Sequence, residues 1–143
     1  MSSIPGVLEL IGRILFGSYF VYTGLGFHVP KTKMAEQYAA SVKFPLPQLA
    51  GWPTGVWMTA AGLSIALGIW PDIGCLMLAA FAIPAALYFH RFWEVEDPNF
   101  KQFQQGYFGR NVIIVGACLV IFAMFVSFGD AVRFTITGPA LSY

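Results

Sequence analysis

NVIIVGACLVIFAMFVSF, residues 111–128, runs for eighteen positions without a charged side chain. A segment of this length and composition predicts a helix that crosses a membrane. The rest of the chain agrees, because its 143 residues are 57% hydrophobic and only 10% charged. Soluble domains carry about 25% charged residues. The sequence therefore indicates an integral membrane protein in which the lipid bilayer is the main partner.

Three further apolar segments precede this one, at about residues 7–27, 52–70 and 73–89. The first alone would rise about 30 Å as a helix, which matches the hydrocarbon thickness. The second has a tryptophan near each end, Trp52 and Trp70, as interfacial anchors. The third contains Pro84, which predicts a kink. We expect one all-α domain over residues 1–143, an integral membrane four-helix bundle with both termini on one side.

The first apolar segment is predicted to be a retained helix and not a signal peptide. No Lys or Arg precedes it, and Glu9 and Arg13 interrupt it early, unlike the basic start and unbroken apolar core of a secretory signal. The two long connections both lie on the side opposite the termini in this topology.

Each long connection shows helical periodicity. In the first, Met34, Tyr38 and Val42 recur behind Thr32, a potential N-cap. In the second, Asp97-Pro98 is typical of a capped helix start, and an apolar stripe follows it. The sequence therefore predicts short interfacial helices in the two long loops.

The charges indicate the orientation and exclude one class of partner. A formal net charge of +1 leaves no basic surface for nucleic acid. Most basic residues lie on the loop side, whereas Arg13 and Arg133 lie on the terminal side. By the positive-inside rule, this asymmetry places the loops in the cytoplasm. The basic residues of the loop side are Lys31, Lys33, Lys43, Arg91, Lys101 and Arg110. The expected location is the cell (cytoplasmic or inner) membrane, crossed several times.

Glu9 and Arg13 form a candidate intramembrane polar pair. They are spaced i, i+4 with Glu first, the favourable order for a helical ion pair. Arg13 should lie roughly 9 Å inside the membrane, where ionisable groups usually face a bundle interior. Two interpretations remain open: a functional polar site at the helix ends, or an arginine that snorkels or binds backbone carbonyls at those ends.

A second candidate site lies on the loop side. His28 and His90 end the first and third apolar segments, and Trp93, Arg110 and Asn111 fall at the same level. Imidazole can bond a carbonyl or pass a proton, and tryptophan offers a flat wall, so this cluster suits a quinone or a lipid head group. The alternative is an ordinary aromatic and basic belt. Two histidines make a poor metal centre, and we expect no metal or haem.

Two cysteines are predicted to be unpaired. Cys75 begins the third segment at the terminal side, whereas Cys118 is placed about 10 Å from the loop side, so their depths should differ by roughly 15 Å or more. A disulfide needs Cα atoms within about 7 Å. Small residues at four-residue spacing, such as Gly62 and Ala66, predict close helix packing.

Several stretches together resemble the DoxX family of four-helix membrane proteins, over nearly the whole chain. The stretches that carry the resemblance are Gly12-Arg13-Ile14-Leu15, Tyr38-Ala39-Ala40-Ser41, Gly62-Leu63 through Leu67-Gly68, Phe89-His90-Arg91-Phe92-Trp93, Phe108-Gly109-Arg110-Asn111 and the tail Gly138-Pro139-Ala140-Leu141-Ser142.

This resemblance implies partnership with oxidoreductases, including a membrane subunit linked to thiosulfate oxidation with quinone as acceptor. It points to Arg13, His90, Trp93 and Asn111 as motif positions. Where many members have a Glu in the second helix, this chain has Met58, which removes a membrane acid that could carry protons.

Two functional hypotheses follow, and the sequence names no reaction for either. In the first, the chain is an accessory subunit of a redox or quinone-linked membrane complex, with a quinone as candidate cofactor. In the second, it is a purely structural subunit that packs against other membrane proteins as a homo- or hetero-oligomer. A transporter is least favoured, because helices two to four contain no acid that could gate or couple transport.

Overall fold

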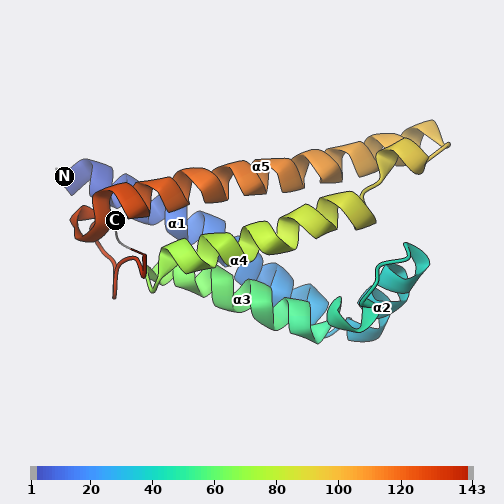
Figure 1. Ribbon diagram of the computed structural model, residues 1–143, viewed down its shortest axis with the longest axis horizontal. Coiled ribbons are helices and arrows are strands. Elements are labelled where there is room, and N and C mark those ends of the chain that lie inside the picture. Colours follow the sequence, from blue (N-terminus) through green and yellow to red (C-terminus); the bar gives the residue numbers. More distant parts are fainter. Residues whose placement is uncertain (1–2, 142–143) are drawn as a thin grey trace.

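The computed structural model describes residues 3–141, and over that range its regular elements are all helices, without a strand. Four long helices lie side by side, with the N- and C-termini at one end and a short helix at the other (Figure 1). Their bounds are α1 Ser3–Thr23, α3 Trp52–Leu67, α4 Pro71–Pro84 and α5 Pro98–Phe128, and the short helix is α2 Thr32–Ser41. The helix α1 continues into a π-helical turn, Gly24–His28, and α4 into another, Ala85–Phe89.

Within residues 3–141, three helical segments are long and apolar enough to cross a membrane: Ser3–His28, Pro71–Glu94 and Pro98–Ala131. These segments confirm a multi-pass membrane protein, as the sequence predicted. The helix α3 has 16 residues and is shorter than each of them.

Glycines let α1 and α3 approach until their backbones touch. A Cβ atom added at Gly17 would overlap the carbonyl oxygen of Gly62, and one added at Gly62 would lie 2.5 Å from the carbonyl oxygen of Gly17. Farther along the same contact, in the π-helical turn that follows α1, a Cβ atom at Gly24 would lie 2.5 Å from the carbonyl oxygen of Gly55. The small-residue packing predicted at Gly62 is therefore a contact between α1 and α3.

The second long connection differs from the prediction, because its helical residues do not form a separate interfacial helix. They are the first turns of α5, which runs unbroken for 31 residues. Asp97 caps it as expected, accepting a hydrogen bond from the backbone N–H of Phe100 at 2.7 Å. After Pro98 no proline interrupts the chain before Pro139, and isolated glycines cost a helix only about 1 kcal/mol each. The amphipathic stripe and the apolar span are one helix.

The first connection does contain the predicted short helix, α2, with Ala35 and Ala39 buried. Thr32 is not its cap, however. Its hydroxyl donates backward to the carbonyl oxygens of His28 and Val29, at 3.1 and 2.9 Å. Thr32 therefore ties α2 to the end of the α1 segment.

Pro84, where the sequence predicted a kink, marks a change of helix type. It has no N–H to donate, and the regular helix α4 ends at this residue. The π-helical turn Ala85–Phe89 begins at the next residue. The α1 segment also ends in a π-helical turn, so both segments widen as they approach the loop end.

The predicted distance between the two cysteines was wrong. Cys75 and Cys118 are both free thiols, but they are buried in one apolar cluster and lie close enough for the thiols to interact. The cause is the position of α5, which extends beyond the start of α4 at the terminal end (Figure 1). This offset brings Cys118 to the depth of Cys75.

The chain after α5 folds back onto the turn between α3 and α4. The backbone N–H of Ile136 donates to the carbonyl oxygen of Leu67 at 3.2 Å. The fully buried carboxylate of Asp72, at the start of α4, accepts the N–H groups of Ala140 and Leu141 at 2.9 and 2.7 Å. This return of the chain closes the terminal end of the bundle. The last residue of the resembling tail, Ser142, lies outside the described residues.

Candidate functional site

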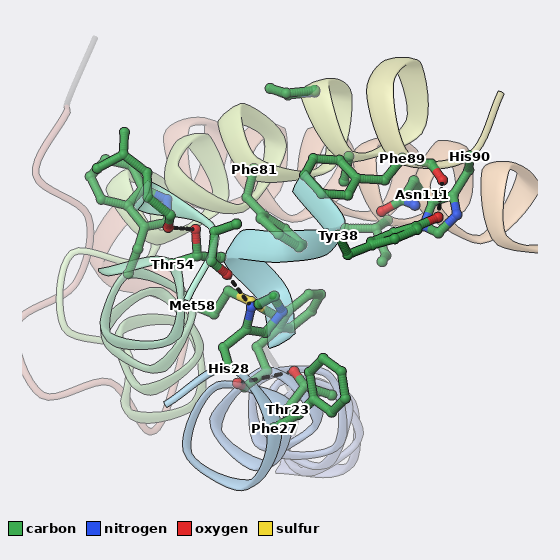
Figure 2. A pocket seen from close by; sticks show the side chains of 18 of the residues that line it. Thr23, Phe27, His28, Tyr38, Thr54, Met58, Phe81, Phe89, His90 and Asn111 are labelled. Atoms are coloured by element: carbon green, nitrogen blue, oxygen red, sulfur yellow. Dashed lines mark hydrogen bonds between the residues drawn. The ribbon is translucent and has the colours of Figure 1, made fainter. Parts of the chain in front are cut away.

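A cavity of about 880 Å³ occupies the loop half of the bundle. Side chains from all four long helices and from α2 line it, and most are apolar or aromatic (Figure 2). Phe20, Met58 and Ile114 contribute to its lining from α1, α3 and α5. This volume falls in the range of about 300–1,000 Å³ that is usual for small-molecule sites.

The neighbouring elements hold the cavity open between α1 and α5. On one side the glycine contact fixes α1 to α3, and on the other α4 packs against α5. Between α1 and α5 at the cavity, the Arg110 guanidinium donates to the Tyr19 hydroxyl at 3.3 Å. The helix α2 covers the loop end, where the Tyr38 hydroxyl donates to the carbonyl oxygen of Phe89 at 3.0 Å.

His28 enters the cavity lining from the end of the α1 segment. Its Nδ1 atom lies 2.8 Å from the carbonyl oxygen of Ala50. A carbonyl oxygen can only accept, so Nδ1 carries the proton and donates it. The ring also meets Phe81 edge to face, with 6.3 Å between the centroids. These two contacts fix the orientation of the imidazole.

His90 enters from the π-helical end of the α4 segment. Its polar partner is Gln104 of α5, with 2.8 Å between Nδ1 and Oε1. The ring lies beside that of Tyr107, 5.2 Å between centroids. Gln104 is buried, and the sequence analysis missed it. The available signal was its position, because it lies between Phe103 and Tyr107 on the apolar stripe of this helix.

Of the other residues predicted for this cluster, Asn111 and Arg110 line the cavity and Trp93 does not. Asn111 is buried, lines the cavity and donates from Nδ2 to the carbonyl oxygen of Tyr107 at 3.0 Å. Arg110 lies at the exposed rim. Trp93 does not line the cavity: it is half exposed and packs on Phe92 and Phe108.

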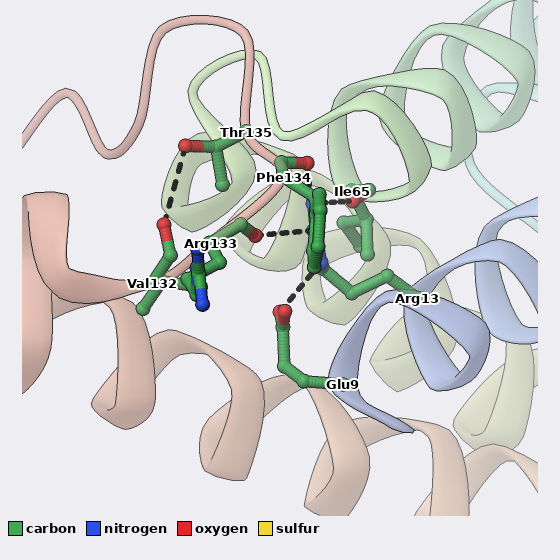
Figure 3. A network of polar contacts seen from close by, with 7 residues as sticks. All are labelled: Glu9, Arg13, Ile65, Val132, Arg133, Phe134 and Thr135. Atoms are coloured by element: carbon green, nitrogen blue, oxygen red, sulfur yellow. Dashed lines mark hydrogen bonds and ion pairs between the residues drawn. The ribbon is translucent and has the colours of Figure 1, made fainter. Parts of the chain in front are cut away.

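The predicted polar pair, Glu9 and Arg13, lies at the opposite end of the bundle (Figure 3). Arg13 is 2% exposed and pairs with Glu9. Its guanidinium also donates to the backbone carbonyl oxygens of Phe134, Arg133 and Ile65, at 2.9, 3.1 and 3.4 Å. The contacts match the carbonyl-binding interpretation, and the pair joins α1 to α3 and to the returning chain.

Within residues 3–141, no three side chains of the His, Cys, Asp and Glu types gather closely enough to hold a metal ion.

The DoxX family model matches residues 8–91, more than half of the sequence. The chain belongs to the DoxX family. Comparisons with curated proteins and with solved structures find no match.

The matched segment of this DoxX chain supplies most of the cavity wall. It contains α1 from residue 8 onward and all of α2, α3 and α4, together with His28 and His90. The remaining wall comes from α5, which lies beyond the match. Met58 is buried against the cavity at 3% exposure. At this position the chain offers a thioether surface for an apolar ligand.

Proposed function

We propose that this DoxX protein is a small accessory subunit of a redox-linked membrane complex, and that its cavity holds the head group of a lipid-soluble quinone. The observation that carries the proposal is the cavity itself. It is an apolar and aromatic space in the loop half of the bundle, with a few polar groups at defined positions. A flat quinone ring with two carbonyl oxygens and an isoprenoid tail has this same distribution of polar and apolar surface. The family resemblance, which links some members to quinone-dependent oxidation, supports the assignment.

The polar groups of the cavity fit such a head group. His28, His90 and Asn111 reach it from three different helical segments, so an inserted ring would meet polar atoms on several sides. Phe81 and Phe89 supply aromatic surface between them. Few convergent polar groups in an apolar pocket are typical of a small-molecule site.

The alternative, a purely structural subunit, leaves the cavity without a role, although its exposed apolar faces suit packing against another membrane protein as well as lipid. The two functions differ in what accompanies the protein. Gentle solubilisation followed by mass spectrometry should recover an oxidoreductase partner together with extractable quinone. Stoichiometric membrane partners without quinone would support the structural role and contradict our proposal.

His90→Ala should lower the total amount of ligand, quinone plus quinol, retained per purified protein by roughly two- to tenfold, because it removes one hydrogen-bonding group, worth about 0.5–1.5 kcal/mol, from the cavity. Quinone is measured by solvent extraction and chromatography. Trp93→Ala is the matched control, since Trp93 lies outside the cavity lining, and it should retain the wild-type amount. Equal retention in both variants would contradict the assignment of the cavity.

We also propose that α3 crosses the membrane, giving four crossings. Its rise of about 24 Å is short, but Trp52 at its start and Trp70 just after its end place an interfacial anchor at each end. Reporter fusions at residues 1 and 143 should then report the same side of the membrane. Reporters on opposite sides would show that one of the four helices does not cross.

A further inference from the structure

Most hydrogen-bond donors of the cavity lining are already engaged by backbone carbonyl oxygens. The hydroxyls of Thr23 and Thr54 donate to Tyr19 and Leu49 at 3.0 and 2.6 Å. In the same way, the Tyr38 hydroxyl donates to Phe89 at 3.0 Å, and the Trp57 indole N–H donates to Met77 at 2.8 Å. These four side chains turn their protons away from the cavity.

The histidines follow the same pattern. Nδ1 of His28 donates to Ala50, so in the neutral ring Nε2 is an acceptor. His90 places Nδ1 on the Gln104 side-chain oxygen, which leaves its Nε2 as an acceptor too. Within residues 3–141, neither Nε2 atom takes part in another hydrogen bond. Figure 2 shows both rings among the side chains that surround the cavity.

Asn111 adds a third acceptor. Its amide nitrogen donates to the Tyr107 carbonyl oxygen at 3.0 Å, and this contact directs the side-chain oxygen elsewhere. The lining donors that remain are the second N–H of the Asn111 amide, the hydroxyls of Tyr19 and Tyr107 and the guanidinium of Arg110. The last three groups belong to exposed side chains at the rim. The interior of the cavity therefore presents the three acceptors of His28, His90 and Asn111 against one remaining amide N–H, and its charged donor lies at the edge.

We propose that the cavity selects the reduced, hydroxyl-bearing form of its ligand, a quinol, over the quinone. This inference rests on the proposed function, because it concerns the redox form of the ligand held in the same cavity. A quinol has two hydroxyl protons to donate to the imidazole and amide acceptors. A quinone has only carbonyl oxygens, which would face these acceptors without a proton between them.

The size of the preference follows from the cost of unpaired polar groups. A buried acceptor that faces another acceptor loses a hydrogen bond and its hydration, at about 1–3 kcal/mol for each group. Sites built to bond a hydroxyl discriminate strongly against analogues that lack it for this reason. One such mismatch corresponds to a preference of about five- to 160-fold.

The test compares three ligands of nearly the same shape on the full-length protein in lipid nanodiscs under anaerobic conditions. They are decylubiquinol, decylubiquinone and the dimethyl ether of the quinol, which has the reduced ring but no hydroxyl proton. Binding is followed by quenching of tryptophan fluorescence, because Trp57 lines the cavity. We expect the quinol to bind at least about fivefold more tightly than the other two.

A single variant removes the Nε2 acceptor of His28 and keeps the hydrogen bond that orients this side chain. In His28→Asn, the amide nitrogen replaces Nδ1 and can still donate to Ala50, whereas the Nε2 acceptor is lost. We expect this variant to lower the affinity for the quinol more than the affinity for the quinone or the ether, and so to reduce the preference for the quinol. Gel filtration confirms that its oligomeric state is unchanged.

The outcomes separate this inference from the function on which it rests. If quinone binds as tightly as quinol, or more tightly, the selectivity is overturned and quinone binding itself is supported. If the ether matches the quinol, the hydroxyl protons do not matter and the inference is also overturned. If none of the three ligands binds, the proposed function fails, and the inference fails with it.

Discussion

Replacing Arg13 by Met should destabilise the protein by about 3–5 kcal/mol, the cost of leaving a buried charge without its partner. Glu9 would keep a carboxylate that is 10% exposed and has lost its cation. Three backbone carbonyl oxygens, two of them in the chain that follows α5, would lose their donor at the same time. Unfolding by SDS in mixed micelles, followed by far-UV circular dichroism, measures the change in free energy.

Two matched variants test whether this cost comes from the buried pair. Arg133→Met removes the same type of side chain from an exposed position and should change stability by less than about 1 kcal/mol. The double variant Glu9→Gln, Arg13→Met removes both charges, so it should recover part of the loss. If the double variant were less stable than Arg13→Met, Glu9 would be stable without the arginine and the pairing argument would fail.

Replacing Gly17 by Leu should be the other severe substitution, with a loss of at least about 2–3 kcal/mol from overpacking. Even a Cβ atom at this position overlaps the Gly62 carbonyl oxygen, which belongs to a helix backbone and has little freedom to move. The two helices would have to separate, which would open the cavity wall that they form. Thermal unfolding in detergent, monitored by thiol accessibility of the buried Cys118, reports this separation.

Gly12→Leu is the control on the same helix. Nothing lies within 4 Å of a Cβ atom at Gly12, and the position is exposed. Leucine also has a higher helix propensity than glycine, by about 0.8 kcal/mol. This variant should therefore be as stable as the wild type or slightly more stable. Similar losses at both positions would show that α1 is sensitive to any side chain and that the close contact with α3 is not the cause.

Local patterns predicted the helical elements well, because they depend on apolar runs and on proline and aspartate at helix starts. The apolar runs located the long helices, and Asp97 located the start of α5. What the patterns did not predict was that α5 continues through the expected boundary at Asn111. Hydropathy falls where a helix leaves the apolar layer, but hydrogen bonding along the helix continues there. A change in hydropathy therefore marks a change of surroundings and not the end of a helix.

Relations between helices were harder to predict. The depth of Cys118 was wrong because it was counted from an assumed start of the span, whereas packing sets the offset between α4 and α5. Asp72 and the returning chain after α5 were missed, since a single aspartate near a turn gives no sign that it binds backbone groups about 70 residues away.

The candidate site was predicted at the level of its residues and not of their contacts. His90, Arg110 and Asn111 do surround one cavity, together with His28. Their partners, however, are Gln104, Tyr19 and the Tyr107 backbone. Sequence position places residues at a common depth, but the rotation of each helix decides which side chains meet. Trp93 illustrates the difference, because it lies near His90 in sequence and yet packs outside the cavity.

The length of α5 produces a hydrophobic mismatch with the bilayer. Its 31 residues rise about 46 Å, against a hydrocarbon thickness of about 30 Å. A helix that is too long must tilt or project into the head-group layer. The terminal end of α5 is the continuous apolar run, so the projecting part is the loop end, where Gln104 and Tyr107 lie. The wall that α5 gives to the cavity therefore runs from the polar head-group layer into hydrocarbon, the same gradient of polarity that a lipid-soluble molecule carries from its ring to its tail.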